Sequence, residues 1–266
     1  MVEYYKLDKV FIQGTTYQTP NDRFYVIKKI GTDQATATKL VIDGVETGAI
    51  SNIVAPTVIT GTKLLGPLDL GSLYYVVPPN KTFYVSGASG AKVRCIGQIG
   101  VLAPGEVIPV NVAARFQDQG NHYLMWLQGS KLYSSDYTWA LGEEISILTL
   151  TPKTIEEYRI NNIVEVETGV ESLAEANAAL RVYLEGKVLD ILTTEPGAKG
   201  MDAYYMPRPP TTTGVMEPFT FADWPITVAG DRTLQLNLIN ISGDNLTVAS
   251  TNNQYIDLIV EYSKKG

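Results

Sequence analysis

The sequence predicts an all-β protein built from two tandem β-sandwiches, and three observations lead to that prediction. Short segments rich in Val, Ile, Tyr, Phe and Thr are separated by Gly, Pro, Asn or Asp every eight to twelve residues or so. The chain has 266 residues, which is enough for two ordinary domains. Three short motifs also occur twice, in the same order. We therefore expect a first domain over residues 1–133 and a second over residues 134–266.

Alternation of apolar and polar residues is clearest near the end of the chain. Leu234, Leu236 and Leu238 alternate with polar residues, as a strand with one buried face requires. In the last segment, apolar residues alternate with Asp257 and Glu261, which we place on the outward face. Both segments are predicted to be strands.

The first half of the chain contains about eight such segments, the number of strands in a jelly roll, a sandwich of two sheets. They are expected around residues 8–14, 23–30, 38–45, 54–60, 72–77, 82–86, 91–99 and 121–127. Residues 102–119 contain two prolines and several polar residues, so we expect a long excursion outside the sandwich. Residues 172–180 have apolar side chains at helical spacing and predict a short helix inserted between strands.

The repeated motifs predict that the two jelly-roll-like sandwiches are related by internal duplication. The first motif is a Thr-Pro pair followed by Tyr-x-Ile. The second is a basic residue and a run of apolar residues that ends in an acidic residue and Gly. The third is Asn/Asp-Lys/Arg-Thr followed by alternating apolar residues. The motifs begin at Thr19 and Thr151, at Lys39 and Arg181, and at Asn80 and Asp231. Their separations are about 133, 142 and 151 residues, and this drift indicates insertions in the second copy.

Composition and charge argue against several classes of protein. The chain carries 21 Lys and Arg against 28 Asp and Glu, a net charge of −7, and it shows no footprint for nucleic-acid binding. The lone Cys95 is expected to be a small buried hydrophobe. Charges among the first ten residues argue against a secretory signal. The most apolar stretch, residues 97–114, is interrupted by prolines, so no membrane-spanning helix is expected.

No catalytic centre, metal site or cofactor is expected. Two-domain jelly-roll enzymes, the cupins, bring several histidines to one metal, whereas this chain has only His122, which we interpret as a polar residue at a strand start. The pairs Glu143-Glu144 and Glu156-Glu157 are adjacent in sequence, and adjacent strand residues point to opposite faces. No Gly-x-Ser-x-Gly elbow is present. We therefore predict that the protein is not an enzyme.

Two polar segments are interpreted as turns. The Gly-rich residues 86–92 lack the spacing of a phosphate-binding loop and are expected to form a hairpin turn. Residues 242–245 are expected to form the corresponding turn in the second copy, with the alternative that their side-chain oxygens help to hold a calcium ion. Three Asn-x-Ser/Thr sequons are candidate glycosylation sites. They are Asn80, Asn240 and Asn245.

Tyrosine content suggests contact surfaces. There are 16 tyrosines against 6 phenylalanines, and Tyr is enriched where proteins touch proteins or sugars. Residues 204–210 combine aromatic residues, Met and Arg, as interface cores do, with an exposed proline-stiffened loop as the alternative. The candidate subunit contacts are Tyr204, Tyr205, Met206 and Arg208.

Two consecutive eight-stranded domains with this internal repeat resemble the double jelly-roll major capsid proteins of icosahedral viruses of bacteria and archaea. The resemblance covers nearly the whole chain and rests on architecture and the repeat, without a family-specific motif. It implies a virion protein made in the host cytoplasm, whose partners are itself, as a homotrimer, and other capsid proteins. It also implies that the six sandwiches of a trimer form a pseudo-hexagonal capsomer.

Long inserts would then be towers or contacts between subunits. The candidates are residues 49–70, 102–119 and 195–223. A second hypothesis is a viral spike or attachment protein whose sandwich binds a receptor or a glycan. That hypothesis predicts a shallow, aromatic-lined site on one domain. A third hypothesis, a tandem-domain enzyme, lacks the necessary metal ligands in the sequence.

Overall fold

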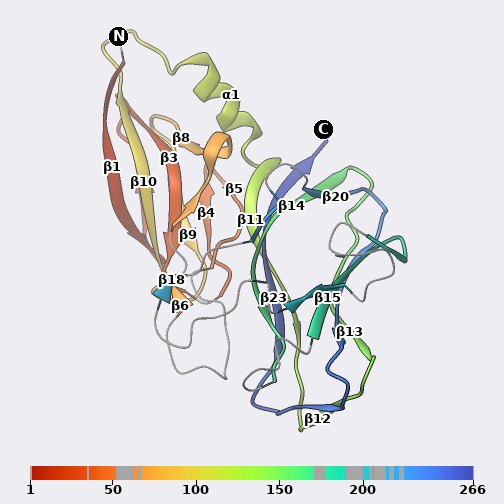
Figure 1. Ribbon diagram of the computed structural model, residues 1–266. Helices are drawn as coiled ribbons and strands as arrows, with labels where there is room; N and C mark the ends of the chain where they lie inside the picture. Colours follow the sequence, from red (N-terminus) through yellow and green to blue (C-terminus); the bar gives the residue numbers. More distant parts are fainter. Residues whose placement is uncertain are drawn as a thin grey trace. The chain divides into compact units, whose positions relative to one another are not determined.

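The computed structural model describes residues 2–34, 36–51, 63–64, 67–170, 178–189, 200–203, 206, 214–215, 219–221 and 225–265 (Figure 1). It is an all-β structure, as predicted, and the chain divides into two compact units. The first unit contains residues 1–53, 64–126 and 261–264, and the second contains residues 54–63, 127–260 and 265–266. The domain boundary expected between residues 133 and 134 stays a prediction.

Two sheets form the first jelly roll. The first sheet has the order β1 (Glu3–Ile12), β10 (Lys92–Val101), β3 (Arg23–Thr32) and β7 (Leu68–Asp69), and β8 (Tyr75–Val77) also pairs with β3. The second sheet has the order β2 (Thr16–Gln18), β9 (Thr82–Ser86), β4 (Lys39–Ile42) and β5 (Val45–Glu46). The pairs are nested along the chain, β1 with β10, β2 with β9, β3 with β8 and β4 with β5, which is the pairing of a jelly roll.

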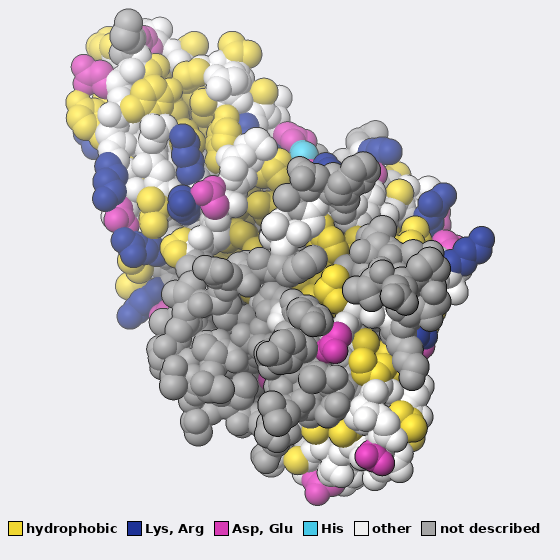
Figure 2. All heavy atoms as spheres, viewed as in Figure 1, with side chains coloured by type: hydrophobic (Ala, Val, Ile, Leu, Met, Phe, Trp, Pro, Cys, Tyr) yellow, Lys and Arg dark blue, Asp and Glu magenta, His cyan; other side chains and the backbone are white. Residues whose placement is uncertain are grey.

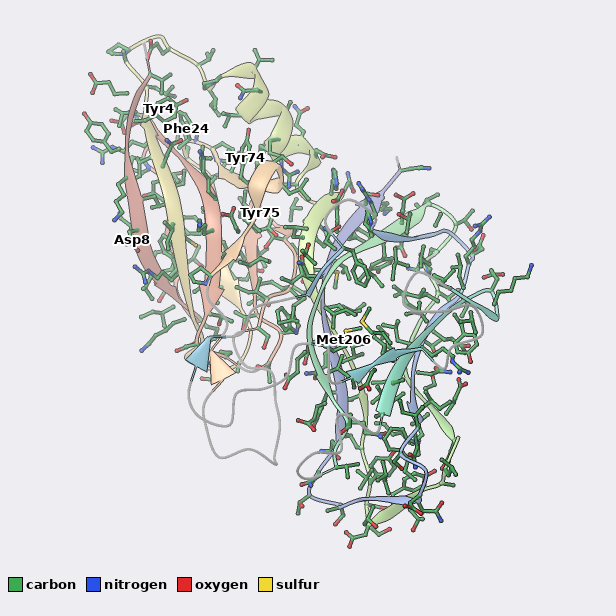
Figure 3. The ribbon with its side chains drawn as sticks, in the orientation of Figure 1. Tyr4, Asp8, Phe24, Tyr74, Tyr75 and Met206 are labelled. Atoms are coloured by element: carbon green, nitrogen blue, oxygen red, sulfur yellow. The ribbon has the colours of Figure 1, made fainter. Side chains whose placement is uncertain are left out.

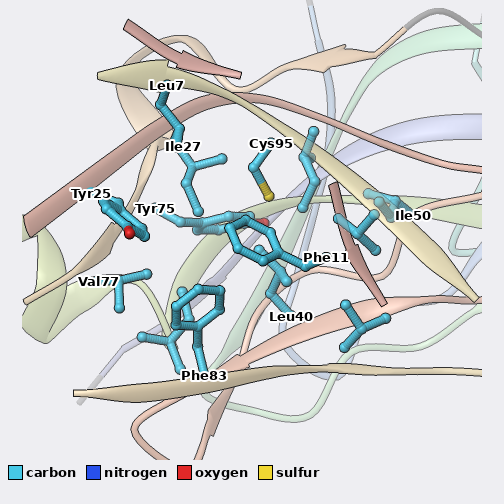
Figure 4. Close-up of a cluster of buried hydrophobic side chains, with 14 of the residues drawn as sticks. Leu7, Phe11, Tyr25, Ile27, Leu40, Ile50, Tyr75, Val77, Phe83 and Cys95 are labelled. Atoms are coloured by element: carbon cyan, nitrogen blue, oxygen red, sulfur yellow. The ribbon is translucent and has the colours of Figure 1, made fainter. Parts of the chain in front are cut away.

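The core of this roll lies between its two sheets (Figure 4). Phe83 of β9 packs against Phe11 of β1 and Tyr25 of β3, with ring centroids 4.8 and 6.1 Å apart. Cys95 of β10 is fully buried in the same cluster, which confirms the prediction for this residue. Its burial raises the pKa of the thiol, because the apolar surroundings disfavour the thiolate.

Helix α1 (Val110–Asp118) covers the outer face of the first sheet, within the segment for which the sequence predicted a long excursion outside the sandwich. Val112 packs against Phe24, Val26 and Val76 of that sheet. Pro109 immediately precedes the helix, where a missing N–H group breaks no helical hydrogen bond. Residues 102–119 therefore do run outside the sandwich, but the expected loop was wrong over the helix.

The strands from β11 onward repeat the nested arrangement. One sheet has the order β11 (His122–Lys131), β23 (Gln254–Lys264), β14 (Glu156–Glu167) and β19 (Phe219–Thr220), and β20 (Ile226–Ala229) also pairs with β14. Another has the order β13 (Glu144–Leu150), β21 (Leu234–Asn240), β15 (Ala178–Leu184) and β16 (Lys187–Val188), and β17 (Met201–Asp202) also pairs with β15. A third sheet joins β12 (Tyr137–Trp139) to β22 (Leu246–Val248). The remaining elements are β6 (Lys63–Leu64), η1 (Gly71–Leu73) and β18 (Gly214–Val215).

Strand pairing follows the sequence motifs at the offsets read from the sequence. In the first copy, Tyr25 lies opposite Val77. Tyr158 follows Tyr25 by 133 residues and Val228 follows Val77 by 151, and these two residues also lie opposite each other. Between β4 and β9, Ile42 lies opposite Phe83. Leu184 and Leu234, which follow these residues by 142 and 151 positions, lie opposite each other between β15 and β21. The repeated strands thus occupy equal positions in their sheets.

The repeated turns share the same unusual backbone. Asp43 and Glu185 have φ angles of 51° and 54°, and each is followed by a glycine that also has positive φ. The Asp43 N–H donates to the carbonyl of Thr82 over 2.8 Å, and the Glu185 N–H donates to the carbonyl of Thr233 over 2.9 Å. The third motif agrees, because its first residue has a φ of 59° in one copy and 64° in the other.

Asn80 offers a test of this turn geometry. Its left-handed conformation, with φ 59°, is accessible to Asn and Gly but costs a β-branched residue about 1–2 kcal/mol. We expect Asn80→Val to lower the free energy of unfolding by that amount and Asn80→Gly to leave it nearly unchanged, as measured by urea denaturation. Equal effects of the two substitutions would contradict the assigned backbone.

Other local predictions had mixed outcomes. The turn after Ser86 joins β9 to β10, which lie in different sheets, so the predicted hairpin was wrong. Strand β11 pairs with β23 and does not close the first roll as its eighth strand. The helix predicted over residues 172–180 was wrong at its end, where β15 begins at Ala178, and residues 172–177 lie outside the described residues. The strand expected at residues 54–60 also lies outside them.

Burial follows the predicted alternation in one strand and departs from it in another. Leu234, Leu236 and Leu238 are buried, as predicted. Asp257 was placed on an outward face, yet it is fully buried, and its Oδ1 accepts a 3.0 Å hydrogen bond from Gln128. Strand β23 is thus covered on both faces at this position, which the period-two pattern of a half-buried strand does not anticipate.

Candidate functional site

The open side of the first sandwich, between the edge strands β1 and β2, is the strongest candidate for a functional site. These two strands end their respective sheets. A pocket of about 320 Å³ opens beside them. Its lining residues are Lys9, Val10, Phe11, Tyr17, Gln18, Tyr25 and Phe83.

Aromatic rings form the wall of this aromatic pocket. Tyr17 stacks on Phe83 with ring centroids 5.5 Å apart and meets the edge of Phe11 at 4.9 Å. The Lys9 ammonium lies 5.8 Å from the centre of the Tyr25 ring, within the range of a cation–π contact. The pocket therefore offers apolar ring faces together with one cation and the polar tips of Tyr17 and Gln18.

A second pocket of about 270 Å³ also borders β1. It is lined by Val10, Gly31, Thr32, Asp33, Pro67, Lys92 and Arg94. Val10, which is 53% exposed, borders both pockets. Both hollows thus adjoin the same edge strand.

Strand β1 itself exposes large side chains along its length. Tyr4, Tyr5, Val10 and Ile12 are 42–55% exposed. Figure 2 shows basic and hydrophobic side chains close together on the flank where β1 lies in Figure 1. A long edge strand with exposed apolar residues is a template for pairing with another chain unless something blocks it.

Asp8 and Arg94 form a paired charge on the outer face of this edge. Arg94 Nε and Nη2 donate hydrogen bonds of 2.9 and 3.0 Å to the two carboxylate oxygens of Asp8. Lys6 Nζ lies 3.7 Å from the same carboxylate. The hydrogen bonds from Arg94 lower the pKa of Asp8 below its usual value. Figure 3 labels Asp8 beside strand β1.

This pairing predicts a measurable titration shift. We expect the pKa of the Asp8 carboxyl to lie below the ordinary aspartate value of 3.8 in a carbon-detected NMR pH series, and Arg94→Gln to raise it. Because the folded-state pKa is depressed, any stability from the pair is present above the unfolded pKa and is lost as the pH falls through the folded pKa. An unchanged Asp8 pKa in the variant would contradict the assigned contact.

His122 stands at the start of β11, as the sequence predicted, and it is held by two carboxylates. Its Nε2 lies 2.8 Å from Glu261 Oε1, and its Nδ1 lies 3.6 Å from Asp118 Oδ2. Across the described residues, no group of three or more His, Cys, Asp or Glu side chains is placed to hold a metal ion. These contacts tie the end of α1 to the ends of two strands.

Two buried polar side chains fasten α1 to the same region. Arg115 Nη2 donates to the carbonyls of Leu73 and His122 over 3.0 and 2.7 Å. Gln119 accepts a 2.8 Å hydrogen bond from the Val76 N–H and donates a 3.1 Å hydrogen bond to the Val76 carbonyl. The side-chain amide of Gln119 thus satisfies the N–H and C=O groups of Val76, as the backbone of a neighbouring strand would.

A matched pair of substitutions tests this role. Gln119→Leu leaves the buried N–H and C=O of Val76 without partners, and we expect it to lower the free energy of unfolding by about 1–3 kcal/mol. Gln117→Leu makes the same change at an exposed position of α1 and should have little effect. Chemical denaturation followed by circular dichroism measures both. Similar losses for the two variants would show that the Gln119 contacts do not matter.

The two members of the pair Glu143-Glu144 bind separate partners. Glu144 accepts hydrogen bonds from Tyr183 and Arg181, and Glu143 accepts one from Tyr137. The two carboxylates therefore stabilise different parts of the structure.

The candidate subunit contacts are only partly described. Met206 is 3% exposed, and its N–H donates a 3.0 Å hydrogen bond to the Ala203 carbonyl. Tyr204, Tyr205 and Arg208 lie outside the described residues. The contact role of these four residues stays a prediction.

The three sequon asparagines differ in their surroundings. Asn80 and Asn245 are exposed in turns. Asn240 is fully buried, and its Nδ2 donates 2.9 Å hydrogen bonds to the carbonyls of Trp139 and Asp244. A glycan on Asn240 would have to displace both bonds, so Asn80 and Asn245 are the accessible candidates. Asn240 also holds the predicted turn at residues 242–245, because its Oδ1 accepts from the Ser242 N–H.

Comparisons with known proteins give low similarity. No family model matches the chain, and no curated protein matches it. Among solved structures, the chain is similar to the major capsid protein P2 of bacteriophage PM2, with 12% identity, a TM-score of 0.36 and coverage of 99% of this chain and 97% of that one. A subviral particle of infectious bursal disease virus VP2 shows 11% identity, a TM-score of 0.25 and coverage of 100% and 77%. BuGH86 in complex with neoagarooctaose shows 10% identity, a TM-score of 0.25 and coverage of 96% and 34%.

At these TM-scores, the similarities determine neither the fold nor the function of this chain. The fold rests on its own strand pairing. In the part of the chain that the structure describes, no helix is both long and apolar enough to cross a membrane.

Proposed function

We propose that the chain is a structural virion protein, a capsid subunit that assembles through its β-sandwiches into trimeric, pseudo-hexagonal capsomers. The observation that carries this proposal is the presence of two nested jelly-roll arrangements in one chain with the same strand order and the same register. Equal registers at the offsets of three sequence motifs also support an origin by internal duplication.

Duplication explains how three chains could tile a shell. A trimer of duplicated sandwiches presents six similar bodies around its axis, and six-fold shapes pack into a hexagonal layer. Closed cyclic symmetry also limits the number of copies in each capsomer. The partners would be other copies of this chain and other capsid proteins, and the place of action would be the virion capsid.

Native mass spectrometry over a range of protein concentrations tests the trimer. We expect a species of three times the 29.1 kDa chain mass that persists on dilution, because a specific interface buries at least about 1,000 Å². A monomer at every concentration, up to the highest that stays soluble, would remove the capsomer proposal.

The aromatic pocket favours a second candidate function, an attachment protein that binds a receptor or glycan. Sugar rings present apolar faces that stack on aromatic side chains, and Lys9 and Gln18 supply polar contacts beside Tyr17. A glycan array should then show binding that is lost in Tyr17→Ala and kept in Tyr84→Ala. Tyr84 is 42% exposed on the neighbouring strand and does not line the pocket, so it is a matched control. Absence of binding in the unmodified chain would remove this candidate.

A further inference from the structure

The outer edge of β1 is a self-complementary surface. Strand β1 ends its sheet, and no strand among the described residues pairs with its outer side. We propose that β1 pairs antiparallel with β1 of a second copy of this chain, about a two-fold axis at Leu7. This contact joins two copies edge to edge and is separate from the proposed three-fold contact.

Backbone geometry decides which residues can take part. Ile12 and Lys92 are the last paired residues of β1 and β10. One position farther along, the Gln13 N–H donates a 2.8 Å hydrogen bond to the Ala91 carbonyl, so Gln13 and Ala91 form a hydrogen-bonded pair. Because bonded and non-bonded pairs alternate in an antiparallel ladder, the odd-numbered residues of β1 bond to β10. The even-numbered residues, from Tyr4 to Ile12, therefore direct their N–H and C=O groups to the outer edge.

The hydroxyl of Tyr17 sets one end of this free edge. The Ile12 N–H donates a 3.0 Å hydrogen bond to Tyr17 Oη, so this group is already satisfied within the chain. The remaining outward-directed residues are Tyr4, Lys6, Asp8 and Val10. Leu7 is the midpoint of this set, which is the position that a two-fold axis requires.

Charge selects the register. Even-numbered residues can exchange backbone hydrogen bonds only with even-numbered residues of the partner, so a symmetric pair must centre on a residue. The residues at the middle of the free edge are Lys6, Leu7 and Asp8. Centring on Lys6 places Lys6 opposite the partner's Lys6, and centring on Asp8 places Asp8 opposite the partner's Asp8. Like charges directly opposite each other destabilise a sheet, whereas opposite charges stabilise it.

Centring on Leu7 gives complementary pairs throughout. Lys6 faces the partner's Asp8, and Asp8 faces the partner's Lys6. Tyr4, which is 47% exposed, faces the partner's Val10, which is 53% exposed. Aromatic and β-branched residues form a favourable cross-strand pair. The charges and the exposed apolar residues of this edge therefore find partners in the same register.

Disulfide trapping tests this register directly. Tyr5 would lie opposite the partner's Lys9 in a non-hydrogen-bonded pair, where Cα atoms come within about 4.5 Å, a separation that a disulfide can bridge. We expect a mixture of Tyr5→Cys and Lys9→Cys chains, oxidised with glutathione disulfide, to form a dimer in which the new cysteine of one variant is bonded to the new cysteine of the other. The native Cys95 is buried and should not interfere.

Each variant alone provides the matched control. Alone, Tyr5→Cys could cross-link in this way only if the axis passed through Tyr5, and Lys9→Cys only if it passed through Lys9. Cross-linking of either variant alone to the same extent as the mixture, or no cross-linking at all, would overturn the proposal. Trimer formation is read separately by native mass spectrometry without oxidant, so the two proposals can fail independently.

Charge reversal gives a second test that needs no cross-link. Lys6→Glu places two like-charge pairs in the contact, and we expect it to weaken pairing of two chains about tenfold, as measured by analytical ultracentrifugation over a range of concentrations. Asp8→Lys should weaken it similarly. Mixing the two variants restores complementary charges and should restore pairing. Failure of the mixture to exceed either variant alone, with both folded by circular dichroism, would contradict the register.

Discussion

Phe83→Ala is expected to lower the free energy of unfolding by about 3–5 kcal/mol, because it removes a fully buried ring and leaves a cavity. Phe83 is 1% exposed and contacts the rings of Phe11, Tyr17 and Tyr25, so its loss affects both sheets of the first sandwich. Urea denaturation measures the change, with intrinsic fluorescence and circular dichroism as separate probes because two units need not unfold together.

Tyr84→Ala is the control for this prediction. Tyr84 follows Phe83 on the same strand but points to the other face and is 42% exposed. We expect a loss of less than about 1 kcal/mol, as is usual for surface substitutions. Comparable losses for the two neighbours would contradict the placement of the core between the sheets.

Gly97→Val is expected to be at least as damaging, at about 3 kcal/mol or more, and to reduce the soluble yield. Gly97 lies at a register shift between β10 and β3, where the backbones approach closely. A Cβ atom there would lie 2.0 Å from the Val26 carbonyl oxygen and 3.0 Å from the Lys28 nitrogen. Both contacts are with backbone atoms, which cannot turn aside as a flexible side chain can.

Gly31→Val makes the same substitution in the paired strand. The Cβ atom at Gly31 would lie 3.4 Å from Pro67, which is an ordinary contact, and the φ angle there is not positive. We expect a much smaller loss of stability and a normal yield. Thermal denaturation and the soluble yield should be measured for both variants. Equal losses of stability in Gly97→Val and Gly31→Val would show that the backbones do not approach closely at Gly97.

The sequence predicted the parts of the fold that depend on local patterns. The alternation in Leu234, Leu236 and Leu238 shows which face of the strand is buried, since successive side chains point to opposite sides. The repeated acidic-Gly turns locate hairpins, because a left-handed residue followed by glycine suits a tight turn. These signals lie within a few residues of one another, so a single sequence contains them.

Features that depend on the meeting of distant segments could not be read in this way. The turn after Ser86 looks like a hairpin because strands flank it, and only the tertiary arrangement shows that those strands lie in different sheets. Helix α1 was missed because Pro109 suggested a loop, although proline suits the start of a helix.

The candidate site is of the second kind. Phe11, Tyr17, Tyr25 and Phe83 come from four different strands, and each resembles an ordinary core residue in the sequence. Their common pocket exists because β1 and β2 both end their sheets. The charge pattern of β1 was visible in the sequence, but its meaning depends on which side of the strand is unpaired.

Electron microscopy of the purified oligomer, or of the particle that contains it, tests the central claim most directly. We predict three-fold class averages with six similar lobes, two from each chain, because each chain contains two jelly-roll arrangements. Tagging the C-terminus should then mark three of the six lobes. Particles without a three-fold axis, or six lobes that each carry the tag, would contradict the account.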